Sequence, residues 1–169
     1  MKMFKLFLKN VVLKVAVIAI AIFLLLQFVV GFYYFRGNSM FPNVKDGDYV
    51  MTWKLSEVQT NDVILYKDSN NKSHIGRVVA KGGDTVSFTE DGELMVNGSI
   101  PSEEVFYPAT VPTGSKLEYP YTVPENEYFI LNDYRTGDSK SYEDSRTYGS
   151  IPESRTYGTV TLLFRRRGF

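Results

Sequence analysis

Arg36-Gly-Asn-Ser39-Met40-Phe41-Pro42 is a short polar turn that separates a long apolar run from a remainder rich in strand-forming segments. The turn therefore joins two parts of different character. If the apolar run lies in a bilayer, Ser39 is placed directly against the membrane surface. A hydroxyl in that position suits an enzyme whose substrate is itself in the membrane.

The apolar run covers residues 15–35, a stretch of 21 residues in which Gln27 is the only strongly polar side chain. At a helical rise of about 1.5 Å per residue it can cross a hydrocarbon core of about 30 Å. A cleaved signal peptide usually has an apolar region of only about 7–15 residues. Here the aromatic segment Gly31-Phe-Tyr-Tyr-Phe35 suits the membrane–water interface on the far side of the bilayer. The pattern favours a retained anchor over a cleaved signal.

Charge predicts how this anchor is oriented. Four lysines precede the apolar run, and no acidic residue occurs before Asp46. Basic residues flanking a first span favour the cytoplasmic side. We therefore expect a single-pass protein of the cell membrane, with a basic cytoplasmic N-terminus (1–14), a transmembrane anchor (15–35) and an extracellular domain (36–169). The four lysines are Lys2, Lys5, Lys9 and Lys14.

The composition excludes several classes of function. The chain has 169 residues with 19 basic and 19 acidic side chains, so the part after the four lysines has a net charge of about −4. Nucleic acid is therefore not an expected partner. The absence of cysteine excludes disulfides and a thiol nucleophile. We expect neither a metal ion nor another cofactor.

The segment beyond Phe35 shows short apolar runs bounded by turn residues and no long 3.6-residue period, so the extracellular domain is predicted to be mainly β. The Asp-Gly turn within 90–93 predicts a hairpin. Residues 98–127 hold most of the prolines and are interpreted as a surface excursion. The pentapeptide Ser-Arg-Thr-Tyr-Gly occurs at 145–149 and 154–158, which is too few copies for a repeat fold. The predicted strands are 49–53, 63–66, 73–80, 85–88, 94–97, 128–131 and 159–164.

Five short motifs follow one another in the order typical of one family. They are Ser39-Met-Phe-Pro42 with Gly47-Asp48, then Asn61-Asp-Val63, Arg77-Val-Val-Ala-Lys-Gly-Gly-Asp84, Asn132-Asp-Tyr-Arg135, and Asp144-Ser-Arg146 with Gly149 and Gly158. In order and spacing they resemble the bacterial type I signal peptidases, membrane-anchored serine proteases that remove signal peptides outside the cytoplasmic membrane. The resemblance extends from the anchor almost to the C-terminus. It implies a signal-peptidase-type β-rich domain with Ser39 in the nucleophile position.

The resemblance also implies a Ser/Lys dyad, because a serine hydroxyl attacks poorly until a neighbouring base takes its proton. A lysine serves as that base only when burial lowers its pKa. The family's lysine immediately precedes the arginine that matches Arg77, and this position is Gly76. The general base is therefore missing. In serine proteases the loss of the base costs about a millionfold in turnover.

Other positions around the motifs also depart from the family pattern. The serine that helps to orient the family's lysine matches Tyr142. Asn132 and Tyr134 replace the glycine and the asparagine of the Gly-Asp-Asn-Arg box. Gly37 stands where many relatives have a serine that supplies a second oxyanion donor, although Gram-positive members often have glycine. The paired loss of the lysine and its helper serine indicates a reduced demand for catalysis.

His74 is the candidate for a substitute base. On a strand the side chains at positions 74 and 76 point to the same face. The two positions are about 6.6 Å apart along the strand. A direct hydrogen bond to the serine then requires a bulge at Gly76. A surface or structural histidine is the alternative interpretation. Lys72 and Lys81 flank the same strand, and for both we expect a solvated ammonium group.

The remaining candidate residues have supporting roles. Arg77 and Asp144 match two residues that, in the family that the sequence resembles, form an ion pair behind the active site. Arg146 is expected to support the same region. Phe41 and Trp53 either dip into the bilayer or pack in the core. The basic run at 165–167 either contacts anionic headgroups or is a solvated strand end.

Two principal hypotheses follow from this pattern. The first is a catalytically impaired family member that binds membrane-presented precursor proteins. This short, Gram-positive-type sequence is most similar to the signal-peptidase-like proteins of streptococcal pilus loci, which implies pilins as clients and a role in pilus assembly. The alternative is an active signal peptidase that cleaves after small residues, with His74 or another group as base. A purely structural membrane protein is a third, weaker possibility.

Overall fold

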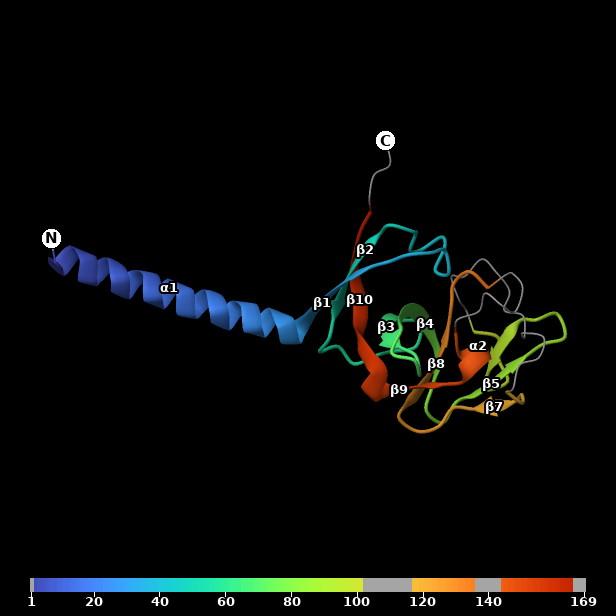
Figure 1. Cartoon of the computed structure of the whole chain (residues 1–169). Helices are drawn as coiled ribbons and strands as arrows, with labels where there is room; N and C mark the ends of the chain where they lie inside the picture. Colours follow the sequence, from blue (N-terminus) through green and yellow to red (C-terminus); the bar gives the residue numbers. More distant parts are fainter. Residues whose placement is uncertain (1, 102–116, 136–143, 166–169) are drawn as a thin grey trace.

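The computed structural model describes residues 2–101, 117–135 and 144–165. A long helix, α1 (Lys2–Val29), projects away from a β-rich domain (Figure 1). The segment Phe7–Val29 has a mean hydropathy of 2.7 and no buried part, and it is long and apolar enough to cross a membrane. Its apolar side chains are thus left uncovered by the described part of the chain.

The helix ends earlier than the sequence pattern predicts. It stops at Val29, and the next residues form strand β1 (Val30–Tyr34), which pairs antiparallel with β2 (Tyr49–Trp53). The end of the segment expected as anchor, residues 30–35, therefore belongs to the β domain. The physical reason is that aromatic and β-branched side chains fit a pleated sheet. Pairing with the distant strand β2 decides between helix and sheet here, and the local sequence does not reveal that pairing.

The described residues of the domain form two antiparallel sheets, so the prediction of a mainly β fold is confirmed. The larger sheet has seven strands in the order β1-β2-β10-β3-β4-β8-β9. The smaller has the order β6-β5-β7, and its β5–β6 hairpin is the one predicted from the Asp-Gly turn. Strand β1, which lies in the segment predicted as anchor, and the two-residue strands β7 and β9 were not predicted. The remaining elements are β3 (Val63–Lys67), β4 (Ser73–Lys81), β5 (Thr85–Phe88), β6 (Leu94–Val96), β7 (Tyr121–Thr122), β8 (Glu127–Leu131), α2 (Ser145–Tyr148), β9 (Ile151–Pro152), the 3-10 helix η1 (Glu153–Arg155) and β10 (Thr156–Phe164).

Strand β4 separates two of the hydrophobic clusters that form the core. Ile75 belongs to a cluster beneath the Ser39 turn, together with Phe35 and Met40. Val78 belongs to a second cluster with Tyr66 and Ile130. Successive side chains on a strand point to opposite faces. Gly76 and His74 therefore lie on the side of the second cluster, away from Ile75.

Gly31 allows close packing of β1 on β2, and we predict that Gly31→Ala lowers the free energy of unfolding by about 1–3 kcal/mol. The added Cβ would lie 2.6 Å from Oγ1 of Thr52, which is fully buried and donates to the carbonyl of Tyr157. Urea unfolding in detergent would measure the change. Phe32→Ala is the control, because Phe32 is 72% exposed. Equal stability of Gly31→Ala and the parent protein would contradict this packing.

Candidate functional site

Ser39 lies in the turn that connects β1 to β2. The base of the turn is closed by two backbone hydrogen bonds, from Phe35 N to Asp48 O at 2.8 Å and from Gly47 N to Phe35 O at 3.0 Å. Met40, the next residue after the serine, is completely buried in the cluster beneath. The Ser39 carbonyl accepts from the backbone N–H of Tyr134 at 2.9 Å. The serine backbone is therefore fixed from both sides.

Ser39 lines a hollow of about 340 Å³ between the turn and the start of β4. Tyr33 and Ser73 join the two walls, since the Tyr33 hydroxyl donates to the Ser73 carbonyl at 3.1 Å. Within residues 2–101, 117–135 and 144–165, no hydrogen bond to the Ser39 hydroxyl is formed. In this part of the chain no side chain is therefore hydrogen-bonded to the nucleophile position, although His74 lines the same hollow. The other lining residues are Phe35, Arg36, Lys72, His74 and Ile75.

One wall of the hollow has an open strand edge. Strand β4 pairs with β3 from Ser73 to Arg77, but its pairing with β8 begins only at Arg77. On the β8 side, residues 73–76 therefore face no strand in the described part of the chain. An open edge of this kind can accept an extended peptide by adding a strand to the sheet.

Gly76, the position matched to the base, has no room for a side chain. A Cβ at this position would lie 2.5 Å from Cγ2 of Ile130 and 3.2 Å from Cε1 of Tyr66. Carbon atoms in favourable contact are about 3.5–4.0 Å apart. The volume next to Gly76 is therefore filled by the second hydrophobic cluster.

His74 is held by an acidic partner. Its Nε2 lies 3.2 Å from Oδ2 of Asp68, and its ring stacks on that of Tyr66 with centroids 5.6 Å apart. Burial acts to raise the pKa of the Asp68 carboxyl, but hydrogen bonds from the backbone of Lys72, from His74 and from the backbone of Asn70 outweigh it, so this pKa lies below its ordinary value. His74 and Ser39 share a hollow, but the observed bond of Nε2 is to Asp68.

Neither lysine flanking β4 provides the buried amine that a lysine base requires. Lys81 Nζ donates to the carbonyl of Val58 at 3.0 Å. Lys72 lines the same hollow as Ser39, but its side chain is exposed.

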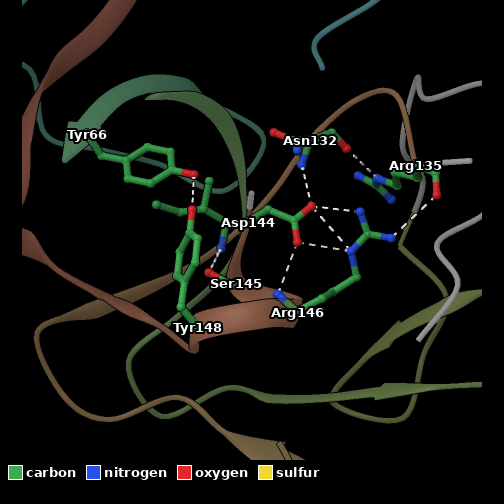
Figure 2. A network of polar contacts seen from close by, with 8 residues as sticks. Tyr66, Asn132, Arg135, Asp144, Ser145, Arg146 and Tyr148 are labelled. Atoms are coloured by element: carbon green, nitrogen blue, oxygen red, sulfur yellow. Dashed lines mark hydrogen bonds and ion pairs between the residues drawn. The ribbon is translucent and has the colours of Figure 1, made fainter. Parts of the chain in front are cut away.

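Tyr66 is a buried phenol close to Gly76. Its hydroxyl is hydrogen-bonded to that of Tyr148 at 2.7 Å, and the two rings approach from different parts of the fold (Figure 2). Burial, followed by the charge and the hydrogen bond of Tyr148, raises the pKa of Tyr66 well above its ordinary value. Tyr66 therefore stays protonated near neutral pH and cannot serve as a base there.

The ion pairs behind the site differ from the expected one. Arg77 does not pair with Asp144 but binds Asp133 in a bidentate manner, from Nε at 2.7 Å and from Nη2 at 2.8 Å. Asp133 also accepts from Nδ2 of Asn43 at 2.7 Å. The expected pair is therefore corrected: Asp133, located at the end of β8, holds both β4 and the Ser39 turn.

Asp144 pairs instead with Arg146, and both side chains are completely buried. Asp144 caps α2 and accepts from Nη2 of Arg146 at 2.7 Å and from the backbone N–H of Asn132 at 3.1 Å (Figure 2). Ser145 accepts from the backbone N–H of Ile130 at 2.9 Å. This network connects α2 to the end of β8. Tyr142 lies outside the described residues.

Phe41 and Trp53 are exposed by 37% and 41%, so neither packs in the core. Trp53 belongs to an apolar face formed by β1, β2 and β10. The register aligns Tyr34 with Tyr49 and Phe164, and Phe32 with Met51 and Leu162. We call this surface the apolar face. Its exposed members are Phe32, Tyr34, Tyr49, Trp53, Leu162 and Phe164.

Comparison with known proteins defines the class that this fold and site represent. Residues 8–165 match the family model described as signal peptidase, peptidase S26, and the chain belongs to this family. It is 28% identical to signal peptidase I of Bacillus amyloliquefaciens, over 89% of this chain and 82% of the relative. It is 26% identical to signal peptidase IB of Staphylococcus aureus, over 90% and 87%.

A solved structure is also similar. The crystal structure of a signal peptidase I from Enterococcus faecalis V583 aligns with a TM-score of 0.50 at 27% identity, covering 63% of this chain and 98% of that chain. These relatives and the apolar helix α1 fit a membrane-anchored protein. Secreted precursors at the membrane are the substrates that the family implies.

Ser39 and His74, both named as candidates from the sequence, line one hollow, and Gly76 lies two residues after His74 on β4. Asp133 was overlooked as a partner, although it lies in the box that carried the resemblance. Ile130 and Asn43 gave no signal, because nothing local marks a residue that will pack against a distant strand.

We predict that Arg146→Met lowers the free energy of unfolding by about 3–5 kcal/mol, because it leaves the buried carboxylate of Asp144 without its cation. Urea unfolding in detergent would measure this. Arg155→Met is the matched control, because Arg155 is only half-buried and near the surface in η1. A similar small effect of both changes would argue against a structural role of the Asp144–Arg146 pair.

The lowered pKa of Asp68 predicts a pH dependence of stability. Its carboxylate contributes stability above its ordinary pKa of about 3.9, and this contribution is lost as the pH falls through the lower folded-state value. Asp68→Asn should therefore be less stable than the parent protein at pH 6, with the difference narrowing below about pH 4. Urea unfolding as a function of pH would measure both proteins. A constant difference down to pH 3 would refute the assignment.

Proposed function

We propose that this signal peptidase family protein binds membrane-presented precursor proteins and cleaves them weakly or not at all. The observation that carries the proposal is Gly76 together with its surroundings. The position has no base, and Ile130 and Tyr66 fill the volume next to it. Loss of a base alone costs about a millionfold in serine proteases. The volume next to Gly76 therefore has no room for a water molecule or another small base in place of the missing side chain.

The groove that would bind the precursor is retained. The hollow beside Ser39 and the open edge of β4 at residues 73–76 together offer backbone groups and side-chain space to an extended segment. Main-chain pairing gives affinity that depends little on sequence, whereas the hollow selects side chains by size. Binding of this type needs neither a nucleophile nor a base.

The membrane is the second partner in this proposal. Helix α1 spans the bilayer with the N-terminal lysines in the cytoplasm, and the β domain lies on the extracellular side. The apolar face lies on β1, the strand that continues from α1, and this continuity favours contact with the bilayer. Trp53, a member of this face, would then be in contact with lipid, and the same is proposed for the exposed Phe41 in the Ser39 turn.

The precursors that we propose are pilins, and the role is assistance in pilus assembly. This finer assignment rests on the resemblance to the signal-peptidase-like proteins of streptococcal pilus loci. A binding factor with a retained groove could hold a membrane-presented pilin in an extended conformation for a separate enzyme. The altered base position fits a protein that presents such a client without cutting it.

The alternative is an active peptidase that uses His74. The shared hollow of Ser39 and His74 is the observation in its favour. The contact of Nε2 with Asp68 and the stacking on Tyr66 are against it, because both hold the ring in its present place. The two functions differ in whether Ser39 is required.

We predict that the full-length protein in lipid vesicles shows no Ser39-dependent cleavage of a membrane-presented preprotein, whereas it can be crosslinked to that preprotein. Ser39→Ala should retain the crosslink, since the hydroxyl contributes no hydrogen bond to the groove in the described residues. Gel analysis of the preprotein would measure both. A relative, signal peptidase IB of Staphylococcus aureus, is the comparison protein.

Two results would overturn the proposal. Cleavage by the native protein that Ser39→Ala abolishes would establish an enzyme, and its loss in His74→Ala would identify the base. Loss of biological function in Ser39→Ala at normal protein level would likewise exclude a purely binding role.

A further inference from the structure

The packing around Gly76 leads to an inference that rests on the proposed function and extends it. We propose that Ile130 is a blocking residue, which occupies the volume that a general base at position 76 would enter. The chain therefore cannot become a peptidase through Gly76→Lys alone. Positions 76 and 130 have to change together before Ser39 can be activated.

The geometry at position 76 excludes even the first atom of a side chain. The distance of 2.5 Å between an added Cβ and Cγ2 of Ile130 is about 1 Å shorter than a favourable contact. The ring of Tyr66 and the carbonyl of Leu131, at 3.2 and 3.4 Å, limit movement of the new atom. The obstruction therefore concerns every residue larger than glycine and is not specific to lysine.

Ile130 is not free to move aside. Its side chain is completely buried, and its backbone is paired with Val78 of β4 and donates to Ser145 Oγ at 2.9 Å. A β-branched side chain has few accessible χ1 rotamers, so Cγ2 cannot easily rotate away. The strand and the side chain are thus both constrained.

Tyr66 closes the other side of the same volume. Its ring is completely buried, and its hydroxyl is fixed by the 2.7 Å hydrogen bond to Tyr148. His74 stacks on the ring from the edge of the strand. Shortening Ile130 is therefore the change that opens space with the least disturbance, because it leaves the polar contacts of Tyr66 intact.

The opened space would suit a lysine base. Its walls would be apolar side chains of the second cluster, and burial among them disfavours the charged ammonium form. A neutral amine could take the proton of Ser39 as Oγ bonds to the scissile carbonyl carbon. The amine would then pass the proton to the leaving nitrogen, and water would release the acyl group from Ser39.

A double-mutant cycle of unfolding free energies tests the packing of Ile130 against position 76 without any assumption about catalysis. The four proteins are the parent, Gly76→Ala, Ile130→Ala and the double variant. We expect Gly76→Ala to be strongly destabilising with Ile130 present and nearly neutral in Ile130→Ala, a coupling of about tenfold or more in the unfolding equilibrium constant. Ile151→Ala, in the same cluster, is the matched control and should give no such coupling. Additive effects of Gly76→Ala and Ile130→Ala would overturn the proposal.

Cleavage of a membrane-presented preprotein tests the consequence. Gly76→Lys and Gly76→Lys/Ile151→Ala should remain inactive, whereas Gly76→Lys/Ile130→Ala should cleave at least about 100-fold faster than Gly76→Lys. Adding Ser39→Ala should abolish this gain. Equal cleavage by Gly76→Lys and Gly76→Lys/Ile130→Ala, or a folded but inactive double variant, would overturn the proposal.

The two proposals fail in different ways. Ser39-dependent cleavage by the native protein would refute the binding function, while the double-mutant cycle would still decide whether Ile130 blocks position 76. If the lysine variants do not fold, the alanine cycle alone provides the decision.

Discussion

The buried carboxylate of Asp133 holds the site together. It binds Arg77 through two hydrogen bonds and Asn43 through a third, and its side chain is completely buried. A buried charge without such partners would be strongly destabilising. The two partners come from β4 and from the Ser39 turn, and Asp133 itself follows β8. Together with the buried Met40 and the bond from the Tyr134 N–H to the Ser39 carbonyl, this carboxylate fixes the position of Ser39 relative to the sheet.

The ion pairs that surround the site, which we call the polar frame, and the apolar groups that fill its interior have different consequences for function. The pairs Arg77–Asp133 and Asp144–Arg146 keep the turn, β4 and β8 in place, and they are intact. The volume next to Gly76, in contrast, is occupied by apolar groups. A binding groove needs the frame but not the base. This combination is what a change from hydrolysis to binding would leave in the structure.

The transition from α1 to β1 links the site to the apolar helix. Lys54 stabilises the end of the helix, because its backbone N–H donates to the carbonyl of Val29 at 2.8 Å and its Nζ to that of Gln27 at 2.7 Å. A cation at a helix C-terminus also interacts favourably with the helix dipole. The chain then enters β1 without a linker. The groove and the apolar face are thereby held close to the end of the helix.

The sequence by itself determined the features that arise from local preferences: the apolar helix, most strands, the β5–β6 hairpin and the Ser39 turn. Tertiary structure decided the rest. The pentapeptide Ser-Arg-Thr-Tyr-Gly shows this, since one copy forms α2 and the other leads from η1 into β10. Arg77 and Asp133 are 56 positions apart, and Gly76 meets Ile130 across the sheet. Partners of buried charges and occupants of buried volume are chosen by strand pairing, which no local pattern contains.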